Sequence, residues 1–182
     1  MTTPARREGA PLTIMRIRSL GDPVLRQLTR PVEVFDDALR RLADDLFETM
    51  YDAPGVGLAA NQVGLQLACF VFDDRDGHTG FVANPELSDL DGEQTDAEGC
   101  LSIPGPYAET TRARSVRLRG RDLEGSPLDV PGEDLLARIF QHETDHLNGM
   151  LYIDRLDDDA RRDVMRQLRE LEVSRVHPDA AP

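Results

Sequence analysis

The chain has 182 residues, 40% of them hydrophobic and 30% charged, which is typical of a folded globular protein and excludes a disordered one. Its 34 acidic residues outnumber 21 basic ones, and the net charge of −13 argues against nonspecific binding to nucleic acid or anionic lipid. All the basic residues are arginines, which excludes Schiff-base chemistry on lysine.

The two cysteines, Cys69 and Cys100, are too few for a disulfide framework. No apolar run is long enough for a signal peptide or a membrane span. We therefore expect a cytoplasmic, reduced protein without membrane or DNA partners. The chain length predicts a single domain over residues 1–182, and a monomer is expected because no apolar surface helix demands a partner. Residues 1–12 are expected to form a flexible tail, and residues 14–18 a short strand or an extended arm.

One clear amphipathic helix is expected in the N-terminal half, from about Asp37 to Tyr51. Its apolar residues recur at the spacing of a single helix face, and Asp36 or Asp37 can cap its first turn. The apolar stripe consists of Leu39, Leu42, Ala43, Leu46, Phe47 and Met50.

A run of small residues with several glycines covers residues 55–64. Two interpretations compete: a tight loop where the backbone approaches a ligand, or a turn that permits close packing. A phosphate-binding loop is excluded, because the lysine and the Ser/Thr that such a loop needs are absent.

Most of the strands are expected after this run, with a hairpin turn at residues 73–77. The strands come first and a long helix comes late, without regular alternation. This order predicts an α+β fold, in which antiparallel or mixed sheets pack around a central helix at residues 133–148. The expected strands are residues 67–72, 81–83, 86–90, 114–119 and 127–130.

The central helix contains His142 and His146, which are four residues apart. This spacing puts both imidazoles on one face, where they can bind a single metal ion. Glu143 lies between them and can exchange a proton with a water on that metal. For this pattern alone, the alternative is an exposed polar helix with coincidental histidines.

A C-terminal helix is expected at residues 157–175, followed by a loose end at residues 176–182. Apolar residues within it recur at helical spacing and are expected to face inward. They are Ala160, Val164, Leu168 and Leu171.

A catalytic metal commonly has three protein ligands, so the two histidines require a third, which must be His78, His177, a carboxylate, Cys69 or Cys100. His78 lies in a polar turn and His177 in a proline-containing tail, which favours solvation of both. Cys69 lies in an apolar strand and is expected in the core. Cys100 precedes an extended segment that ends in proline, and it is therefore the expected third ligand.

Three segments together resemble the motifs of the peptide deformylases, and their order and separation also fit. The resemblance extends from about residue 14 to residue 155, and the combination is more specific than the histidine motif alone, which many zinc proteases share. The segments are Gly55-Val56-Gly57-Leu58-Ala59-Ala60-Asn61-Gln62, Glu98-Gly99-Cys100-Leu101-Ser102 and Gln141-His142-Glu143-Thr144-Asp145-His146.

The resemblance implies hydrolysis of the formyl group from the N-terminal methionine of newly made bacterial polypeptides. It also implies one divalent metal ion, Fe²⁺ with Zn²⁺ or Ni²⁺ able to occupy the site, bound by Cys100, His142 and His146. Glu143 would take a proton from the attacking water and pass it to the leaving amine.

The same resemblance assigns the remaining parts of the site. The side-chain amide of Gln62 and the backbone N–H of Leu101 would stabilise the tetrahedral oxyanion. The backbone at Gly57 would pair with the extended substrate, because close approach tolerates no side chain. The pocket for the methionine side chain would be formed by Val56, Leu135, Ile139 and the ring of His142.

Two positions differ from some relatives, and one charged pair has two interpretations. Arg138 replaces an aliphatic residue, so it either lines the pocket mouth with its stem or lies on the surface. Tyr107 stands where some relatives carry an arginine beside the peptide groove. Glu98 and Arg112 form either a supporting ion pair behind the site or two unrelated surface charges.

In some bacterial relatives a C-terminal helix docks on the ribosome. Residues 157–182 contain seven acidic residues and five arginines, so strong attraction to RNA is not expected. An amphipathic helix packed on the domain is favoured, and a transient ribosome contact is the alternative.

Two other functions are alternatives. A zinc endopeptidase could use the same histidine pair, but it would not need Cys100 or the run at residues 55–64. A metal-stapled binding module without turnover would need a fourth protein ligand.

Overall fold

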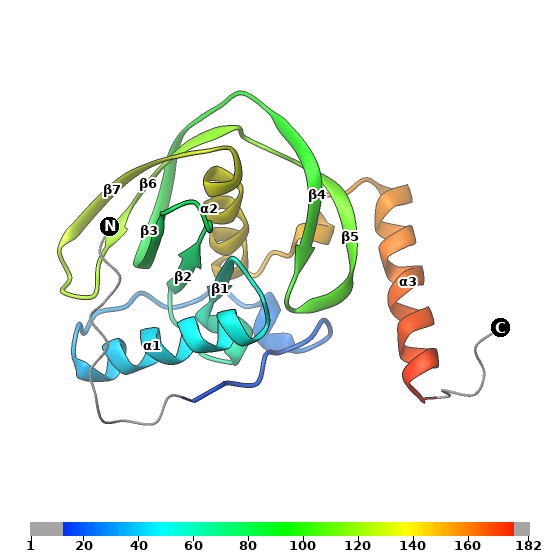
Figure 1. The fold of residues 1–182 in the computed structure, drawn as a ribbon, viewed down its shortest axis with the longest axis horizontal. Coiled ribbons are helices and arrows are strands. Elements are labelled where there is room, and N and C mark those ends of the chain that lie inside the picture. The colour runs from blue at the N-terminus through cyan, green and yellow to red at the C-terminus, as the bar shows by residue number, and fades with distance from the viewer. Residues whose placement is uncertain (1–12, 177–182) are drawn as a thin grey trace.

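The computed structural model describes residues 13–176 and has the predicted α+β fold, with two antiparallel sheets and three α-helices (Figure 1). The predicted tail at residues 1–12, the end at residues 177–182 and His177 lie outside the described residues. The helices are α1 (Asp37–Asp52), α2 (Asp134–Leu147) and α3 (Asp158–Val176), and the strands are β1 (Gly57–Ala59), β2 (Cys69–Asp73), β3 (Thr79–Asp91), β4 (Gln94–Cys100), β5 (Ile103–Arg112), β6 (Ser115–Arg121) and β7 (Pro127–Glu133).

The larger sheet has five strands in the order β1-β2-β3-β6-β7, and each neighbouring pair is antiparallel. The predicted hairpin joins β2 to β3 at residues 74–78, where the carboxylate of Asp74 accepts hydrogen bonds from the N–H groups of Asp76 and His78. The ring of His78 also contacts the Asp74 carboxylate, and His78 does not belong to the cluster of candidate metal ligands found among residues 13–176.

Strand β3 joins two segments that were expected to be separate strands. A register shift lies between Ala83 and Glu86, and Asn84 adopts a positive φ of 52°. The Asn84 side chain bonds to both backbone polar groups of Val32. The sequence shows a break at Asn84 because the strand bulges there, but the strand continues beyond the bulge.

Helices α1 and α2 cover opposite faces of the larger sheet, as the alternation of β2 shows. Cys69 and Val71 pack with α1, whereas Phe70 and Phe72 pack with α2. Phe72 meets Phe140 of α2 edge to face, with 5.1 Å between ring centroids. The predicted stripe of α1 is buried except for the partly buried Leu42, and the side chain of Asp36 caps the helix. This packing fixes α2 against the sheet, with its histidines toward the smaller sheet.

The smaller sheet is the β4–β5 hairpin, which was not predicted as two strands. Its residues at 94–98 and 104–111 are mostly polar or proline, because large parts of both faces are exposed. The sequence therefore lacks the alternation that indicates a half-buried strand. Cys100 ends β4 at the tip of this hairpin, directly before the turn at residues 101–102.

Helix α3 packs beside β5 and away from the larger sheet (Figure 1). Its bounds agree with the prediction to within one residue. Val164 is buried in a third apolar cluster with Ile103 and Tyr152, and Leu168 is partly buried. Leu171, predicted to face inward, is 39% exposed, although its Cδ1 approaches Gly105 of β5. Among residues 13–176, no helix combines the length and apolar character needed to cross a bilayer.

Candidate active site

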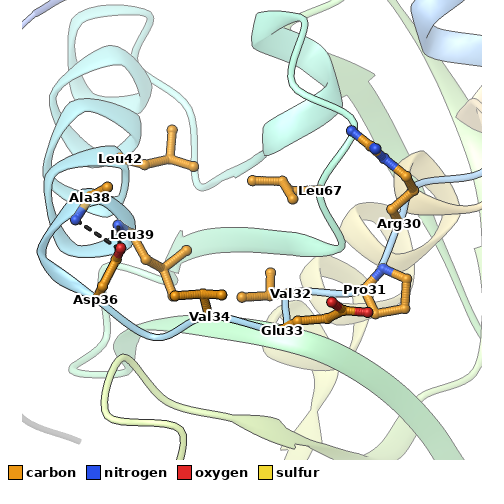
Figure 2. A pocket seen from close by; sticks show the side chains of 10 residues that line it. All are labelled: Arg30, Pro31, Val32, Glu33, Val34, Asp36, Ala38, Leu39, Leu42 and Leu67. Atoms are coloured by element: carbon orange, nitrogen blue, oxygen red, sulfur yellow. Dashed lines mark hydrogen bonds between the residues drawn. The ribbon is translucent and has the colours of Figure 1, made fainter.

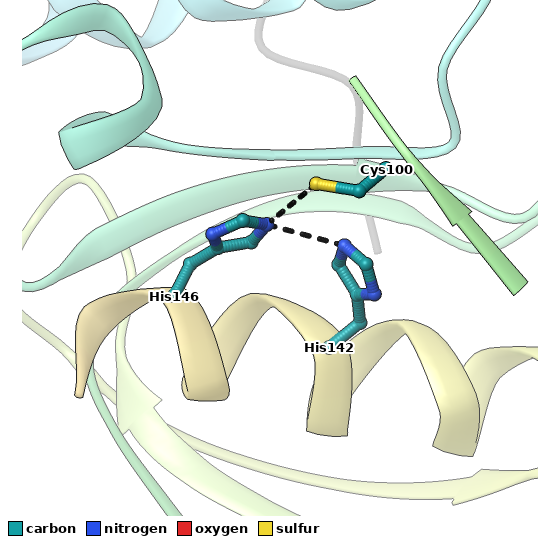
Figure 3. A group of neighbouring side chains, drawn as sticks. All are labelled: Cys100, His142 and His146. Carbon is teal, nitrogen blue, oxygen red and sulfur yellow. Dashed lines mark hydrogen bonds between the residues drawn. The ribbon is translucent and has the colours of Figure 1, made fainter. Parts of the chain in front are cut away.

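Three metal-ligating side chains converge between α2 and the tip of the β4–β5 hairpin. They are Cys100, His142 and His146, and their ligand atoms all lie within 4.8 Å of one another (Figure 3). The Nε2 atom of His146 is 3.2 Å from Cys100 Sγ and 3.2 Å from His142 Nε2. The histidines are adjacent because four residues make about one helical turn. The structure thus brings together the three ligands proposed from the sequence.

The chemistry of these groups fits a divalent cation. His142 Nδ1 donates to the Glu98 carboxylate at 2.7 Å, so Nε2, which faces His146, is the nitrogen that can give an electron pair to a cation once it has lost its proton. Two imidazole nitrogens and a cysteine sulfur therefore point at one small volume. Soft sulfur and imidazole donors in this number suit Zn²⁺, Fe²⁺ or Ni²⁺ better than Mg²⁺ or Ca²⁺.

The two histidines have opposite proton affinities in this arrangement. Burial opposes the charged form of His142, but hydrogen bonds to Cys100 and Glu98 raise its pKa well above the usual value. Burial and the neighbouring His142 lower the pKa of His146 well below the usual value. A metal ion would compete with the proton on His142, so metal affinity should rise with pH.

Glu98 and Arg112 form the expected ion pair, and both are buried, so the alternative of two surface charges is wrong. Arg112 binds both carboxylate oxygens of Glu98, with Nε at 3.1 Å and Nη2 at 2.6 Å. Burial would raise the pKa of Glu98, but hydrogen bonds from His142 and Arg112 hold it well below the usual value. Glu98 therefore remains an anion behind His142, a candidate metal ligand.

Glu143 is buried and does not belong to the cluster of three candidate metal ligands. Its Oε2 atom has no hydrogen-bond partner among the described residues. Burial raises the pKa of Glu143 to about 7, against the lowering effect of His142. A Cβ atom at Gly57 would overlap the Glu143 carboxylate, so the two residues are in close contact. A buried carboxylate with a free oxygen is suited to bind and move a proton.

The run at residues 55–64 combines features of both interpretations made from the sequence. It is not an irregular loop, because it contains β1 and a 3-10 turn at Ala60–Val63. Gln62 ends near the metal-binding group, with Nε2 at 3.7 Å from Cys100 Sγ and 3.2 Å from Ser102 Oγ. Its Oε1 atom accepts from the backbone N–H of Ala59 at 2.9 Å. The amide is therefore held with its N–H₂ group directed toward the site.

A cavity of about 520 Å³ opens beside these groups. Every residue proposed for the site from the sequence lines it, except His146. Arg138 is among them and is buried, so the alternative of a surface residue is wrong. Tyr107 is 68% exposed at the rim and covers Gly99. The residues singled out from the sequence that line it are Val56, Gly57, Gln62, Cys100, Leu101, Leu135, Arg138, Ile139, His142 and Glu143, together with Tyr107.

Sequence reasoning missed several residues that line this cavity. Ile17 comes from the N-terminal arm, which is extended and not a strand, and Pro104 and Pro106 come from β5. None of them belongs to a motif with recognisable chemistry, and their approach depends on how distant segments pack. The pattern of residue types along the sequence contains no signal for such positions.

A second cavity, of about 600 Å³, lies between the segment at residues 30–34 and α1 (Figure 2). Apolar side chains, among them Val34, Leu42 and Leu67, form much of its wall. Its two carboxylates belong to Glu33 and to Asp36, which caps α1 through the N–H of Ala38. Its lining contains no histidine or cysteine, so of these two cavities only the first is lined by candidate metal ligands.

Comparisons of the sequence with known proteins identify one family. A family model described as polypeptide deformylase matches residues 14–162. The peptide deformylase of Acidothermus cellulolyticus is 52% identical over 162 residues, which cover 88% of this chain and 89% of that protein. Peptide deformylase 1 of Corynebacterium glutamicum is 48% identical over 162 residues, covering 87% of this chain and 96% of that protein.

Solved structures agree with the sequence comparison. The crystal structure of a peptide deformylase from Legionella pneumophila matches with a TM-score of 0.85 and 40% identity, covering 93% of this chain and 100% of that chain. The crystal structure of peptide deformylase from Thermus thermophilus matches with a TM-score of 0.82 and 42% identity, covering 92% of this chain and 100% of that chain. The resemblance of the three motifs is thereby confirmed, and the chain belongs to the polypeptide deformylase family.

Proposed function

We propose that this deformylase, a hydrolase that removes the formyl group from the initiator methionine of newly synthesised polypeptides, carries out the reaction in the cavity between α2 and the β4–β5 hairpin. The observation that supports this location best is the convergence of three metal-ligating atoms within 4.8 Å beside a buried, partly unpartnered carboxylate, Glu143. Both features adjoin one 520 Å³ cavity. The whole catalytic apparatus is then contained in a single domain over residues 1–182.

Cys100, His142 and His146 would hold one divalent ion, and we infer Fe²⁺ with Zn²⁺ or Ni²⁺ able to take its place. When bound, the ion lowers the pKa of a water molecule and polarises the formyl carbonyl. Three protein ligands are the number that a catalytic site uses while keeping a position open. A cysteine that must stay free to bind metal is best preserved where thiols are kept reduced, which supports a cytoplasmic location.

Glu143 is the proposed proton carrier. Its unpartnered Oε2 atom would accept the proton of the attacking water and deliver it to the amine nitrogen of methionine as the C–N bond breaks. The Gln62 Nε2 group and the backbone N–H of Leu101 would donate hydrogen bonds to the oxyanion that develops on the formyl oxygen. Both donors lie beside Cys100, one across the site and one next in sequence.

The substrate would lie along Gly57 with its methionine side chain in the apolar part of the cavity. Val56, Leu135 and Ile139 would contact that side chain together with the ring of His142, and the stem of Arg138 would border it. Tyr107 at the rim would then face residues after methionine. We propose that the chain acts as a monomer, and that α3 packs on the domain; a transient ribosome contact through α3 stays a prediction.

The alternative functions have less support. A metal-stapled binding module would need a fourth protein ligand, and the cluster found among residues 13–176 contains three. A zinc endopeptidase would not need Cys100, whose sulfur is 3.2 Å from His146 Nε2.

Formate release from formyl-Met-Ala by anaerobically prepared Fe²⁺ protein tests the proposal. We expect catalytic release that a chelator stops and added Fe²⁺ restores. Acetyl-Met-Ala is the control, because its blocking group should not be removed. Release of free alanine without formate would indicate an endopeptidase, and no hydrolysis by the metal-loaded protein would favour a binding module.

Replacing Gly57 with alanine is expected to slow the reaction about 10- to 100-fold. The added Cβ would overlap the Glu143 carboxylate and displace it, and a shift of about 1 Å in a catalytic group can cost ~100-fold in rate. Formate release measures the rate, and a crystal structure of the variant shows the carboxylate.

Gly77→Ala is the control, because no atom lies within 4 Å of its Cβ position. With a φ of 100°, that residue should lose roughly 1 kcal/mol of stability without losing activity. A Gly57→Ala enzyme with full activity would contradict the proposed approach of substrate and carboxylate.

A further inference from the structure

Arg138 is a buried arginine that the proposed chemistry does not use directly. It lies on α2, one helical turn before the metal ligand His142, and its side chain is 8% exposed. Its Nη1 atom donates to Glu98 Oε2 at 2.6 Å and to the backbone carbonyl of Thr110 at 2.9 Å. The guanidinium therefore contacts the β4–β5 hairpin and not only the substrate cavity.

The Glu98 carboxylate is shared among three donors. Oε1 accepts from Arg112 Nη2 at 2.6 Å and from His142 Nδ1 at 2.7 Å. Oε2 accepts from Arg112 Nε at 3.1 Å and from Arg138 Nη1 at 2.6 Å. Arg138 thus holds the oxygen opposite the one that orients His142, and it limits rotation of the carboxylate toward or away from the ring.

These contacts continue as a chain of alternating charges. Arg112 Nη1 donates to Asp145 Oδ2 at 2.5 Å, and Asp145 is bound on both oxygens by Arg155 at 2.6 Å. Arg138 and Asp145 belong to α2, whereas Glu98 and Arg112 belong to the hairpin. The hairpin is a separate sheet from the five strands under α2, so this chain of charges joins the element that carries Cys100 to the element that carries the histidines.

We propose that Arg138 is a positioning residue for His142, which acts through Glu98 to hold the imidazole in its metal-binding orientation and to keep α2 in register with the hairpin that carries Cys100. This inference rests on the proposed function, because it takes His142 and Cys100 as metal ligands.

General energetics favour positioning over stability as the role of this arginine. Replacing buried ion pairs with apolar groups of similar volume is often neutral or stabilising, so a buried arginine is weak evidence for a stabilising role. Arginine also suits the geometry better than lysine, because its planar guanidinium can bind a carboxylate and a carbonyl at once from fixed positions. By contrast, groups that orient a metal-bound histidine commonly change metal affinity or activity 10- to 100-fold when removed.

Co²⁺ binding to Arg138→Leu and Arg138→Gln tests the inference, with Co²⁺ absorbance reporting both the thiolate contact and the ligand geometry. We expect the dissociation constant for Co²⁺ to rise about 10- to 100-fold and the ligand-field bands to shift. With saturating metal, kcat for formyl-Met-Ala should fall while KM changes little. Arg138→Lys should recover part of the affinity, because one ammonium can still donate to Glu98.

Two control variants separate this role from others. Arg114→Leu removes an exposed arginine whose partner is Asp134, and it should leave Co²⁺ affinity and the spectrum unchanged. Leu135→Ala alters the same cavity without touching Glu98, and it should raise KM while the Co²⁺ spectrum stays that of the wild type.

NMR of ¹⁵N-labelled histidine in the metal-free proteins adds a readout independent of activity. The proton on His142 Nδ1 should exchange faster with solvent in both Arg138→Leu and Arg138→Gln than in the wild type.

Three outcomes would overturn the inference. A raised KM with wild-type Co²⁺ affinity would make Arg138 a pocket residue only. A lower melting temperature with an unchanged spectrum and unchanged histidine signals would make it merely structural. If Arg138→Leu does not fold, a wild-type affinity for Co²⁺ in Arg138→Gln would by itself overturn the inference. Failure of the wild type itself to bind Co²⁺ through a thiolate would instead refute the proposed metal site.

Discussion

Glu143→Gln is expected to abolish most deformylation while metal binding persists. The amide has nearly the shape of the carboxylate but cannot accept the proton of the attacking water. Loss of general acid–base catalysis commonly costs about 10²- to 10⁴-fold in rate, which corresponds to roughly 3–5 kcal/mol in the activation free energy. Formate release measures the rate, and elemental analysis of the purified protein measures the metal.

A carboxylate elsewhere on the protein provides the control for this experiment. Glu109 is exposed on β5, and Glu109→Gln makes the same chemical change away from the cavity, so it should keep the wild-type rate. A Glu143→Gln enzyme that deformylates at the wild-type rate would falsify the proposed role of Glu143. Loss of metal from that variant would instead indicate that the carboxylate supports the metal site.

Cys100→Ala is expected to lose both metal and activity. Its sulfur is one of three candidate ligands, and the other two are the imidazoles of His142 and His146. Among residues 13–176 the cluster contains no further cysteine or histidine that could replace it. Removal of groups in the outer shell of a metal site costs up to about 100-fold in affinity, so loss of a direct ligand should cost more than ~100-fold. Competition with a metallochromic chelator measures the change in the dissociation constant.

Cys69→Ala is the matched control, because it removes the other thiol from a site in the core of the sheet. Burial raises the pKa of Cys69 to about 12, so this thiol stays protonated and is not expected to bind metal. The variant should keep its metal and its activity, with a modest loss of stability from the small void. Tight, stoichiometric metal binding by Cys100→Ala would rule out the proposed ligand set.

The elements that the sequence predicted well have strong local signals. The apolar stripe and the cap of α1 fix its position, and the wide apolar arc of α2 indicates a buried helix. The β4–β5 hairpin had no such signal, because its strands are largely exposed and contain prolines. Its existence depends on contacts with α2 and α3, which a pattern of single residues does not report.

The candidate site shows the same division. The spacing of His142 and His146 gives their adjacency directly, because it follows from helix geometry. Cys100 was singled out only by elimination of the other candidate ligands, because its closeness to the histidines depends on two segments far apart in the chain meeting. Arg138 could not be placed from sequence, because its burial depends on Glu98, a partner that comes from the hairpin.

The separation of the ligands between two backbone units links metal capture to folding. Cys100 and His146 are 46 residues apart in the chain, and their side chains meet only when α2 and the hairpin are docked. An ion that binds this folded state and not the unfolded chain adds about 4 kcal/mol to the free energy of unfolding at a free concentration 1,000 times its dissociation constant. Metal scarcity should therefore lower the free energy of unfolding of the enzyme as well as its activity.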